Sequence, residues 1–322
     1  MQGDAQSLQL PDTDRRSRGY FYLSLRRLSR KKLSMACLTI IVILYGSGIF
    51  APVVAPYGYN EQNLSIAKEG PSLGHPLGTD RLGRDLLSRV MFSLRTTVII
   101  TVTSLVTGAL IIGVTLGLIA GYFGRMADGI IMRVGEVTSA FPDIFLVLII
   151  VATVKPRILQ WVRGFEDATG IDWIIRLGIV DYTVISLALA AFSWFGMARL
   201  VRGQVLQARE NQYVEAARAM GSSTRRILGK HLLPNVISPV IVSVSAGLGA
   251  VAGAEVVLSW LGIGIQPPTP SLGVMIFENG NISVLRSDPH LTLVPSSVLV
   301  LLLFTFSLLG DGLNDAFNPR AR

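Results

Sequence analysis

The stretch "YVEAARAMGSSTRRILGKHLLPN", from Tyr213 to Asn235, is a polar and basic segment set between two long apolar runs. These runs extend from Tyr182 to Leu200 and from Val236 to Leu258, and a helix needs roughly 20 apolar residues to cross a bilayer. The pattern predicts two membrane-spanning helices joined by a solvated helical loop.

The composition of the whole chain agrees with a membrane protein. The 322 residues are 50% hydrophobic and only 16% charged, with a mean hydropathy of +0.52, so there are too few charged groups to cover a soluble globule of this size. A net charge of +8 is compatible with nucleic-acid binding, but the basic residues occur in short bursts beside apolar runs rather than along one polar surface. We therefore expect no nucleic-acid partner. The single cysteine, Cys37, excludes an intrachain disulfide and a cysteine-based metal site.

Six apolar runs are long enough to be membrane spans. They are Leu33 to Val54, Thr96 to Ala120, Val134 to Val154, Tyr182 to Leu200, Val236 to Leu258 and Leu293 to Leu309. Pro142 and Asp143 interrupt the third run. The first run is longer than a signal-peptide core and no cleavage site follows it, so we expect it to remain as an anchor. The predicted fold class is all-α, a polytopic membrane protein with six transmembrane helices.

The distribution of basic residues predicts the orientation, because Lys and Arg are retained on the cytoplasmic side of a membrane. The basic residues of the leader are Arg15, Arg16, Arg18, Arg26, Arg27, Arg30, Lys31 and Lys32. Those of the central loop are Arg199, Arg202, Arg209, Arg218, Arg225, Arg226 and Lys230. Six crossings place the leader, this loop and the C-terminus together, so we expect both termini in the cytoplasm.

The outer segment conflicts with this rule because it also carries arginines. Arg81 with Asp85, and Asp85 with Arg89, are spaced four residues apart, so we expect their charges to be paired. The expected organisation is a cytoplasmic basic leader (1–32), a first transmembrane helix (33–54), an outer segment with a short amphipathic helix (55–95), a five-helix core that includes the cytoplasmic loop 201–234 (96–312) and a cytoplasmic tail (313–322).

The opening stretch predicts two short helices that meet at a glycine. A helix from Tyr213 to Met220 is expected to end at Gly221 in a left-handed conformation. Ser222 or Ser223 then caps a second helix through Leu233, which Pro234 stops. The alanines of the first helix leave room for another protein to approach its backbone; they are Ala216, Ala217 and Ala219. The simpler interpretation is a solvated connector between two spans.

The spacing of this stretch favours the functional interpretation. It has E-A-A, three residues, G, nine residues, a histidine, one residue, and L-P; the residues are Glu215, Ala216, Ala217, Gly221, His231, Leu233 and Pro234. This resembles the EAA loop of the permease subunits of bacterial ABC importers. The resemblance implies a type I permease architecture in the bacterial inner membrane. It also implies that the loop docks on an ATPase, with Glu215 as the first contact; Arg218 is either a further contact or only a charge retained inside.

Other stretches resemble the dipeptide, oligopeptide and nickel permease family. They are "HPLGTDRLGRDLLSR" (His75 to Arg89), "GYFGRMADGIIMR" (Gly121 to Arg133), "ARLVRGQVL" (Ala198 to Leu206), "EVVLSWLGIGIQPPTPSLG" (Glu255 to Gly273) and "GDGLNDAFNPR" (Gly310 to Arg320). The sequence departs from this family at Leu272, Glu136 and Leu94, and the segment from Lys155 to Asp181 is long and charged for an outer loop. The resemblance implies a permease subunit of an ATP-driven importer of di- or oligopeptides; the alternative substrate is a nickel chelate or another small solute.

The chain has no G-x-x-x-x-G-K-[ST] phosphate-binding loop and no H-E-x-x-H or G-x-S-x-G motif, so we expect a transport subunit rather than an enzyme. We expect it to bind neither a metal nor a cofactor. The resemblance implies that ATP and Mg²⁺ are bound by two nucleotide-binding partner subunits. It also implies a second homologous permease chain and an external solute-binding protein. The alternative in another class is a membrane scaffold or an ATP-independent channel.

Two further groups are candidate site residues. Glu255, Ser259 and Trp260, near the outer end of the fifth span, either line the translocation pathway or gate, or pair at the interface. Asp80 is expected to cap a short outer helix through Arg89. With Arg84 and Asp85, this helix either shapes the outer vestibule or only lies at the interface.

Two glycine-containing stretches give further expectations. The seam of Gly113, Gly117 and Gly121 contacts either another helix of this chain or the second permease chain. The glycine- and proline-rich "LGIGIQPPTPSLG", from Leu261 to Gly273, predicts a re-entrant outer turn.

Overall fold

The computed structural model describes residues 20–317, and within these residues the secondary structure is helical apart from one isolated bridge between Thr79 and Asp85. Most of the predicted leader and the last residues of the predicted tail lie outside the described range. Six helices are long and apolar enough to cross a membrane. They are Lys32–Ile49, Leu86–Phe123, Asp143–Thr169, Ile179–Ala208, Thr224–Trp260 and Pro289–Phe317. The predicted all-α fold with six spans is confirmed.

The elements follow one another along the chain with few long connections. The first half comprises α1 (Tyr20–Arg30), α2 (Lys32–Ile49), α3 (Ala51–Val54), η1 (Leu64–Ile66), α4 (Leu86–Ser104), η2 (Leu105–Gly113), α5 (Val114–Phe123), α6 (Arg125–Ser139) and α7 (Asp143–Thr169). The second half comprises α8 (Trp173–Arg176), α9 (Ile179–Ala208), α10 (Gln212–Ala219), α11 (Thr224–Arg226), η3 (Ile227–Leu232), α12 (Leu233–Trp260), α13 (Leu272–Asn279), α14 (Ile282–Ser287) and α15 (Pro289–Phe317).

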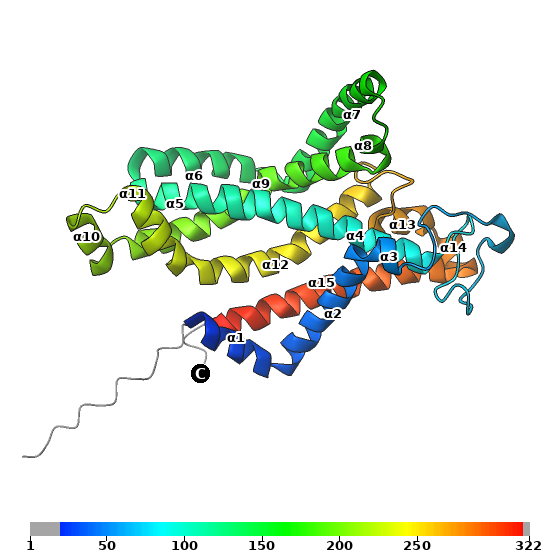
Figure 1. The fold of residues 1–322 in the computed structure, drawn as a ribbon, viewed down its shortest axis with the longest axis horizontal. Helices are drawn as coiled ribbons and strands as arrows, with labels where there is room; N and C mark the ends of the chain where they lie inside the picture. Colours follow the sequence, from blue (N-terminus) through cyan, green and yellow to red (C-terminus); the bar gives the residue numbers. More distant parts are fainter. Residues whose placement is uncertain (1–19, 318–322) are drawn as a thin grey trace, which may run out of the picture.

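The two ends of the helical bundle are built differently (Figure 1). One end carries α10 and α11 together with α1 and the end of α15; we call it the elbow end, and residues 212–232 the elbow. The opposite end carries residues 55–85, α13 and α14; we call it the outer end. The elbow and the described chain ends therefore lie on the same side of the bundle.

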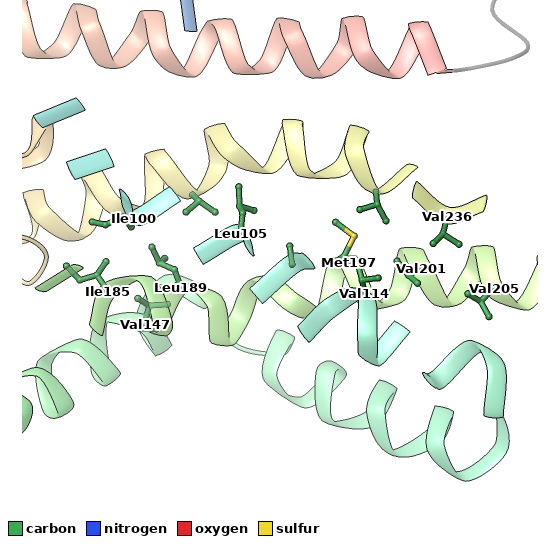
Figure 2. Close-up of a cluster of buried hydrophobic side chains, with 14 of the residues drawn as sticks. Ile100, Leu105, Val114, Val147, Ile185, Leu189, Met197, Val201, Val205 and Val236 are labelled. Atoms are coloured by element: carbon green, nitrogen blue, oxygen red, sulfur yellow. The ribbon is translucent and has the colours of Figure 1, made fainter. Parts of the chain in front are cut away.

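The main core fills the space between the rod formed by α4, η2 and α5, helix α9 and helix α12. Figure 2 shows Ile100 and Leu105 of the rod, Val201 and Val205 of α9, and Val236 of α12 in this core, and all five are buried. Such interdigitation matters in a membrane protein because lipid tails are as apolar as the side chains, so close packing rather than the hydrophobic effect holds the helices together.

The glycine seam of the second span makes an intrachain contact. A Cβ atom at Gly113 would lie 2.7 Å from the carbonyl oxygen of Trp194, and one at Gly117 would lie 2.7 Å from that of Ala198. Real Cβ atoms do not approach backbone so closely, so only glycine allows η2 and α5 to lie directly against α9. Of the two alternatives for this seam, the structure shows the contact within the chain.

The third predicted span, Val134 to Val154, is divided between two helices. Helix α6 ends at Ser139 and α7 begins at Asp143. Pro142 causes the break, because proline has no backbone N–H and disfavours the helical conformation in the residue before it. Helix α7 then continues to Thr169, so most of the residues predicted to form a charged outer loop, 155–181, are helical instead.

Two further boundaries differ from the prediction. The short outer helix expected from Asp80 to Arg89 is not a separate element, because the second span itself begins at Leu86. Pro234 does not stop the second elbow helix either, since it occupies the first turn of α12, where its missing N–H would have no helical partner in any case. The chain therefore runs without interruption from Thr224 through α12.

Candidate functional site

The elbow helix α10 ends at a glycine in the predicted left-handed conformation. Gly221 has φ +75°, and its N–H donates to the carbonyl of Arg218 over 2.9 Å. The N–H of Ser222 donates to the carbonyl of Ala217 over 3.0 Å, which completes a Schellman-type end. A Cβ atom at Gly221 would meet no atom within 4 Å. The glycine is therefore required by the backbone conformation and not by lack of space.

One face of α10 is anchored in the core, and the opposite face is exposed. Val214 and Ala217 are buried against the same cluster as Ile227 of η3, whereas Glu215 and Ala216 face outward. Glu215 lies in the first turn, where a negative charge is favourable. Ala217, one of the three alanines predicted to leave room for a partner, therefore lies on the buried face of α10.

The exposed tip of α10 also carries a residue that sequence reasoning missed. Met220 is 80% exposed and lies directly before Gly221. A flexible apolar side chain at the tip of a polar helix is typical of adaptable protein contacts. The available signal was an isolated methionine immediately before the helix-ending glycine. Arg218 is exposed as well. Its guanidinium carbon lies over the ring of Tyr122 of α5, 5.1 Å from the ring centroid.

The remaining motif residues lie on the second arm of the elbow. His231 belongs to the π-helical turn η3, and Leu233 and Pro234 open α12. The side chain of Asn235 donates to the carbonyl of His231 over 2.7 Å and to the hydroxyl of Tyr213 over 2.9 Å. The motif residues thus lie on both arms of the elbow: Glu215 and Ala216 on the exposed face of α10, and His231, Leu233 and Pro234 at the junction of η3 and α12.

At the outer end, Glu255 is fully buried and accepts hydrogen bonds from three hydroxyl groups. Ser259 and Ser271 donate over 2.9 and 2.8 Å, and Thr97 of α4 donates over 3.2 Å. Ser259 in turn accepts from the N–H of Ile265. The carboxyl group therefore ties the turn 261–271 and the start of α13 to α4 and α12. The predicted trio is divided, because Trp260 is 49% exposed and takes no part in this cluster.

A second polar contact holds the same turn, and the sequence reasoning missed it. Lys155 of α7 is buried; its Nζ lies 2.7 Å from the carbonyl oxygen of Gly264 and 3.0 Å from a carboxylate oxygen of Asp181. Asp181 also accepts from the N–H of Gln266. The only available signal was a single lysine at the end of an apolar run. The turn 261–271 is consequently held from both sides, by Glu255 and by Lys155.

The predicted outer residues Asp80 and Arg84 form a buried ionic cluster. Arg84 Nε donates to Asp80 over 2.6 Å, and Arg89 contacts both Asp80 and Glu278 of α13. Burial acts to raise the pKa of Asp80, but the charge of Arg89, the backbone N–H groups of Arg84 and Leu82 and the charge of Arg84 together lower it below its usual value. The carboxylate of Asp80 is therefore ionised at neutral pH.

Asp85, and not Asp80, caps the helix. Its side chain accepts from the N–H of Ser88 over 2.7 Å, and its other oxygen lies 2.9 Å from Nδ1 of His75. The predicted pairs of Asp85 with Arg81 and with Arg89 are not formed. Arg81 is exposed, and Arg89 binds Asp80 across a turn instead of along a helix, because residues 79–85 precede the first helical turn.

Comparisons with known proteins show the family to which the chain belongs. Residues 113–322, more than half of the chain, match the family described as binding-protein-dependent transport system inner membrane component. Residues 19–71 match the N-terminal transmembrane domain of oligopeptide transport permease C.

Similar proteins cover nearly the whole chain. A dipeptide transport system permease protein of Alkalihalophilus pseudofirmus is 35% identical over 92% of this chain and 89% of its own length. A glutathione transport system permease protein of Pectobacterium atrosepticum is 36% identical over 92% and 90%. An oligopeptide transport system permease protein of Mycobacterium tuberculosis is 35% identical over 93% and 94%. The chain therefore belongs to the family of binding-protein-dependent transport system inner membrane components, the ABC importer permeases that its motifs resemble.

Proposed function

We propose that this chain is a translocating subunit of an ATP-driven peptide importer and that the elbow receives the mechanical input from an ATPase. The peptide substrate is supported by the three similar permeases, which are named for dipeptides, oligopeptides and glutathione, all compounds with peptide bonds. The observation that carries the coupling role is the construction of α10, with one face anchored in the core and the other, with Glu215 and Met220, free for a partner.

The coupling follows from how the elbow is joined to the spans. A push on the exposed face of α10 meets the buried Val214 and Ala217, which pack in the same core cluster as η3. The hydrogen bond between Tyr213 and Asn235 transmits the displacement to the first turn of α12. A packed core resists deformation, so the displacement moves α12 as a rigid body rather than compressing the elbow.

The proposed assembly contains a second permease chain, two nucleotide-binding subunits that hold ATP and Mg²⁺, and an external solute-binding protein. The elbow, the N-terminus and the C-terminus face the cytoplasm in this proposal, because the leader and the central loop hold most of the basic residues. The outer end, with residues 55–85, then faces the solute-binding protein.

The test is a charge reversal on the exposed face of α10 in the assembled complex. Glu215→Arg is expected to abolish peptide uptake and the ATP hydrolysis stimulated by the binding protein, with the chain still present in the membrane. Gln207→Arg is the matched control, because Gln207 is also exposed at the elbow end but belongs to α9. If Glu215→Arg leaves both uptake and stimulated hydrolysis at the wild-type level, the elbow is not the coupling site.

A further inference from the structure

A groove of about 1160 Å³ opens at the elbow end between α9, α12 and α15. Along α12 its wall extends from Pro234 to Ala250, which is ~24 Å at the helical rise of 1.5 Å per residue. This length is most of the ~30 Å hydrocarbon thickness of a bilayer. The groove therefore passes from the elbow deep into the membrane-spanning part of the chain.

The lining of the groove combines apolar residues with several polar side chains. The side chains that carry hydrogen-bonding groups are Gln204, Asn235, Ser238, Ser243, Ser307, Asp311 and Asn314. Apart from Asn235, none of them makes a side-chain hydrogen bond or an ion pair within residues 20–317. Such groups are not left facing lipid, because unsatisfied polar atoms are costly there. Water, a solute or another chain must meet them.

The charge in the groove is of one sign. Among the described residues that line it, Asp311 alone is charged, and it is exposed into the groove region without an ion-pair partner in the part of the chain that the structure describes. The other polar groups are amides and hydroxyls, which both donate and accept hydrogen bonds. This combination fits a solute with amide groups and one cationic end, and it provides no cation to hold a carboxylate.

We propose that this groove is the elbow-side half of the solute pathway and that Asp311 receives the ammonium group of a peptide passing through it. The proposal rests on the proposed function and names a subsite within it. A single exposed carboxylate attracts an ammonium group only weakly, which suits a site that must release its solute. Amides and hydroxyls serve any peptide backbone, whatever its side chains.

The groove is connected to the elbow directly. Asn235 lines the groove and is the residue whose side chain donates to Tyr213 of α10. A displacement of α10 therefore moves the α12 wall of the groove, and we expect the groove to narrow when the ATPase subunits close.

The first arm of the test measures whether the groove contains water. The native chain has a single cysteine, Cys37, which is buried, so introduced thiols are read against a low background. Ser238→Cys, Ser243→Cys and Ser307→Cys are expected to react with a charged methanethiosulfonate added from the elbow side of membranes that hold the assembled complex. Phe304→Cys is the matched control, because Phe304 is 61% exposed on α15 but does not line the groove.

The second part of the test measures how fast charged reagents modify Ser307→Cys, which lies one helical turn before Asp311, and whether closure of the ATPase subunits changes that rate. The ratio of the reaction rates with a cationic and an anionic reagent is expected to fall about tenfold when Asp311→Asn is added, since one charge at this distance in water changes each rate by a few-fold in opposite directions. Asp315→Asn, which removes a carboxylate outside the groove, is expected to leave the ratio unchanged. Trapping the ATPase subunits with vanadate is expected to slow the reaction.

The third arm uses trialanine and N-acetyl-trialanine as probes. Trialanine is expected to slow modification of Ser307→Cys more than its acetylated form, which lacks the ammonium group, and Asp311→Asn is expected to remove this difference. Unreactive groove cysteines, a rate that trapping does not change, or a rate ratio insensitive to Asp311→Asn each overturn the proposal. These outcomes are independent of peptide uptake by the wild-type complex, whose absence would instead overturn the proposed function.

Discussion

Asn235 donates a hydrogen bond to the hydroxyl of Tyr213 over 2.9 Å and so joins the first turn of α10 to the first turn of α12 across 22 residues of sequence. The two arms of the elbow are consequently held together by a side-chain contact as well as by the chain. The buried side chains of both arms, such as Val214 of α10 and Ile227 of η3, also belong to one hydrophobic cluster.

Removal of this bond is expected to uncouple the elbow from α12. Tyr213→Phe eliminates the acceptor but keeps the ring, and a hydrogen bond of this kind contributes about 0.5–1.5 kcal/mol. We expect peptide uptake per ATP hydrolysed to fall several-fold. Asn235→Ala is expected to cause a similar loss, and the double variant no more than the larger single loss. Additive effects in this double-mutant cycle would show that the two residues act separately.

The left-handed residue at the end of α10 gives a second prediction. Because Gly221 has φ +75°, a β-branched residue there is strained by roughly 1–2 kcal/mol or more. Gly221→Val is expected to abolish stimulated ATP hydrolysis, and Gly221→Asn to retain part of it, since asparagine tolerates this conformation. Gly229→Ala is the control: this glycine has no positive φ and open space around it. Equal losses for Gly221→Val and Gly229→Ala would contradict the conformational explanation.

The ion pair of Lys155, which is buried, and Asp181, which is partly buried, gives a third prediction. Removing one member leaves the other without its charge partner, and breaking a buried ion pair typically costs about 3–5 kcal/mol. We therefore expect Lys155→Met to lower the thermal unfolding temperature in detergent, and Lys155→Met with Asp181→Leu to recover part of the loss. Arg157→Met, at an exposed position two residues further on, is expected to have little effect. A double variant less stable than either single variant would exclude this pairing as the cause.

The ionic cluster of Asp80 predicts a pH dependence. The charge of Arg89 and the surrounding hydrogen bonds outweigh burial and hold the pKa of Asp80 below its usual value. A carboxyl group with a lowered folded-state pKa contributes stability that is fully present above its unfolded pKa of about 3.9 and is lost as the pH falls through the folded value. Thermal unfolding followed from pH 7 to pH 3 is therefore expected to show a steep loss below about pH 4.

The matched variants for this pH dependence are two neutralised carboxylates. Asp80→Asn is expected to be less stable at pH 7 and to show a weaker loss on acidification. Asp167→Asn, at an exposed position of α7, is expected to keep the wild-type profile. An unchanged profile in Asp80→Asn would mean that other groups cause the loss of stability in acid.

The sequence by itself determined the features that depend on composition and on local backbone chemistry. A run of about 20 apolar residues must cross the bilayer or be buried inside the protein, whatever its neighbours are. Six spans could therefore be predicted from hydropathy alone. Gly221 ends α10 as expected, because the left-handed conformation is a property of that residue and its immediate neighbours. The spacing from Glu215 to Pro234 identified the family without any tertiary information.

Only the tertiary structure decided which polar groups meet. Lys155 contacts Gly264 over a separation of 109 residues, and Thr97 contacts Glu255 over 158. No local period connects such positions. The predicted pairing of Asp85 with Arg89 was wrong for the same reason: the carboxylate of Asp85 caps the helix and contacts His75, and the turn at residues 79–85 brings Asp80 to Arg89 instead. The packing of the helices brings these polar groups together, and it depends on close contacts such as that of Gly113 with α9.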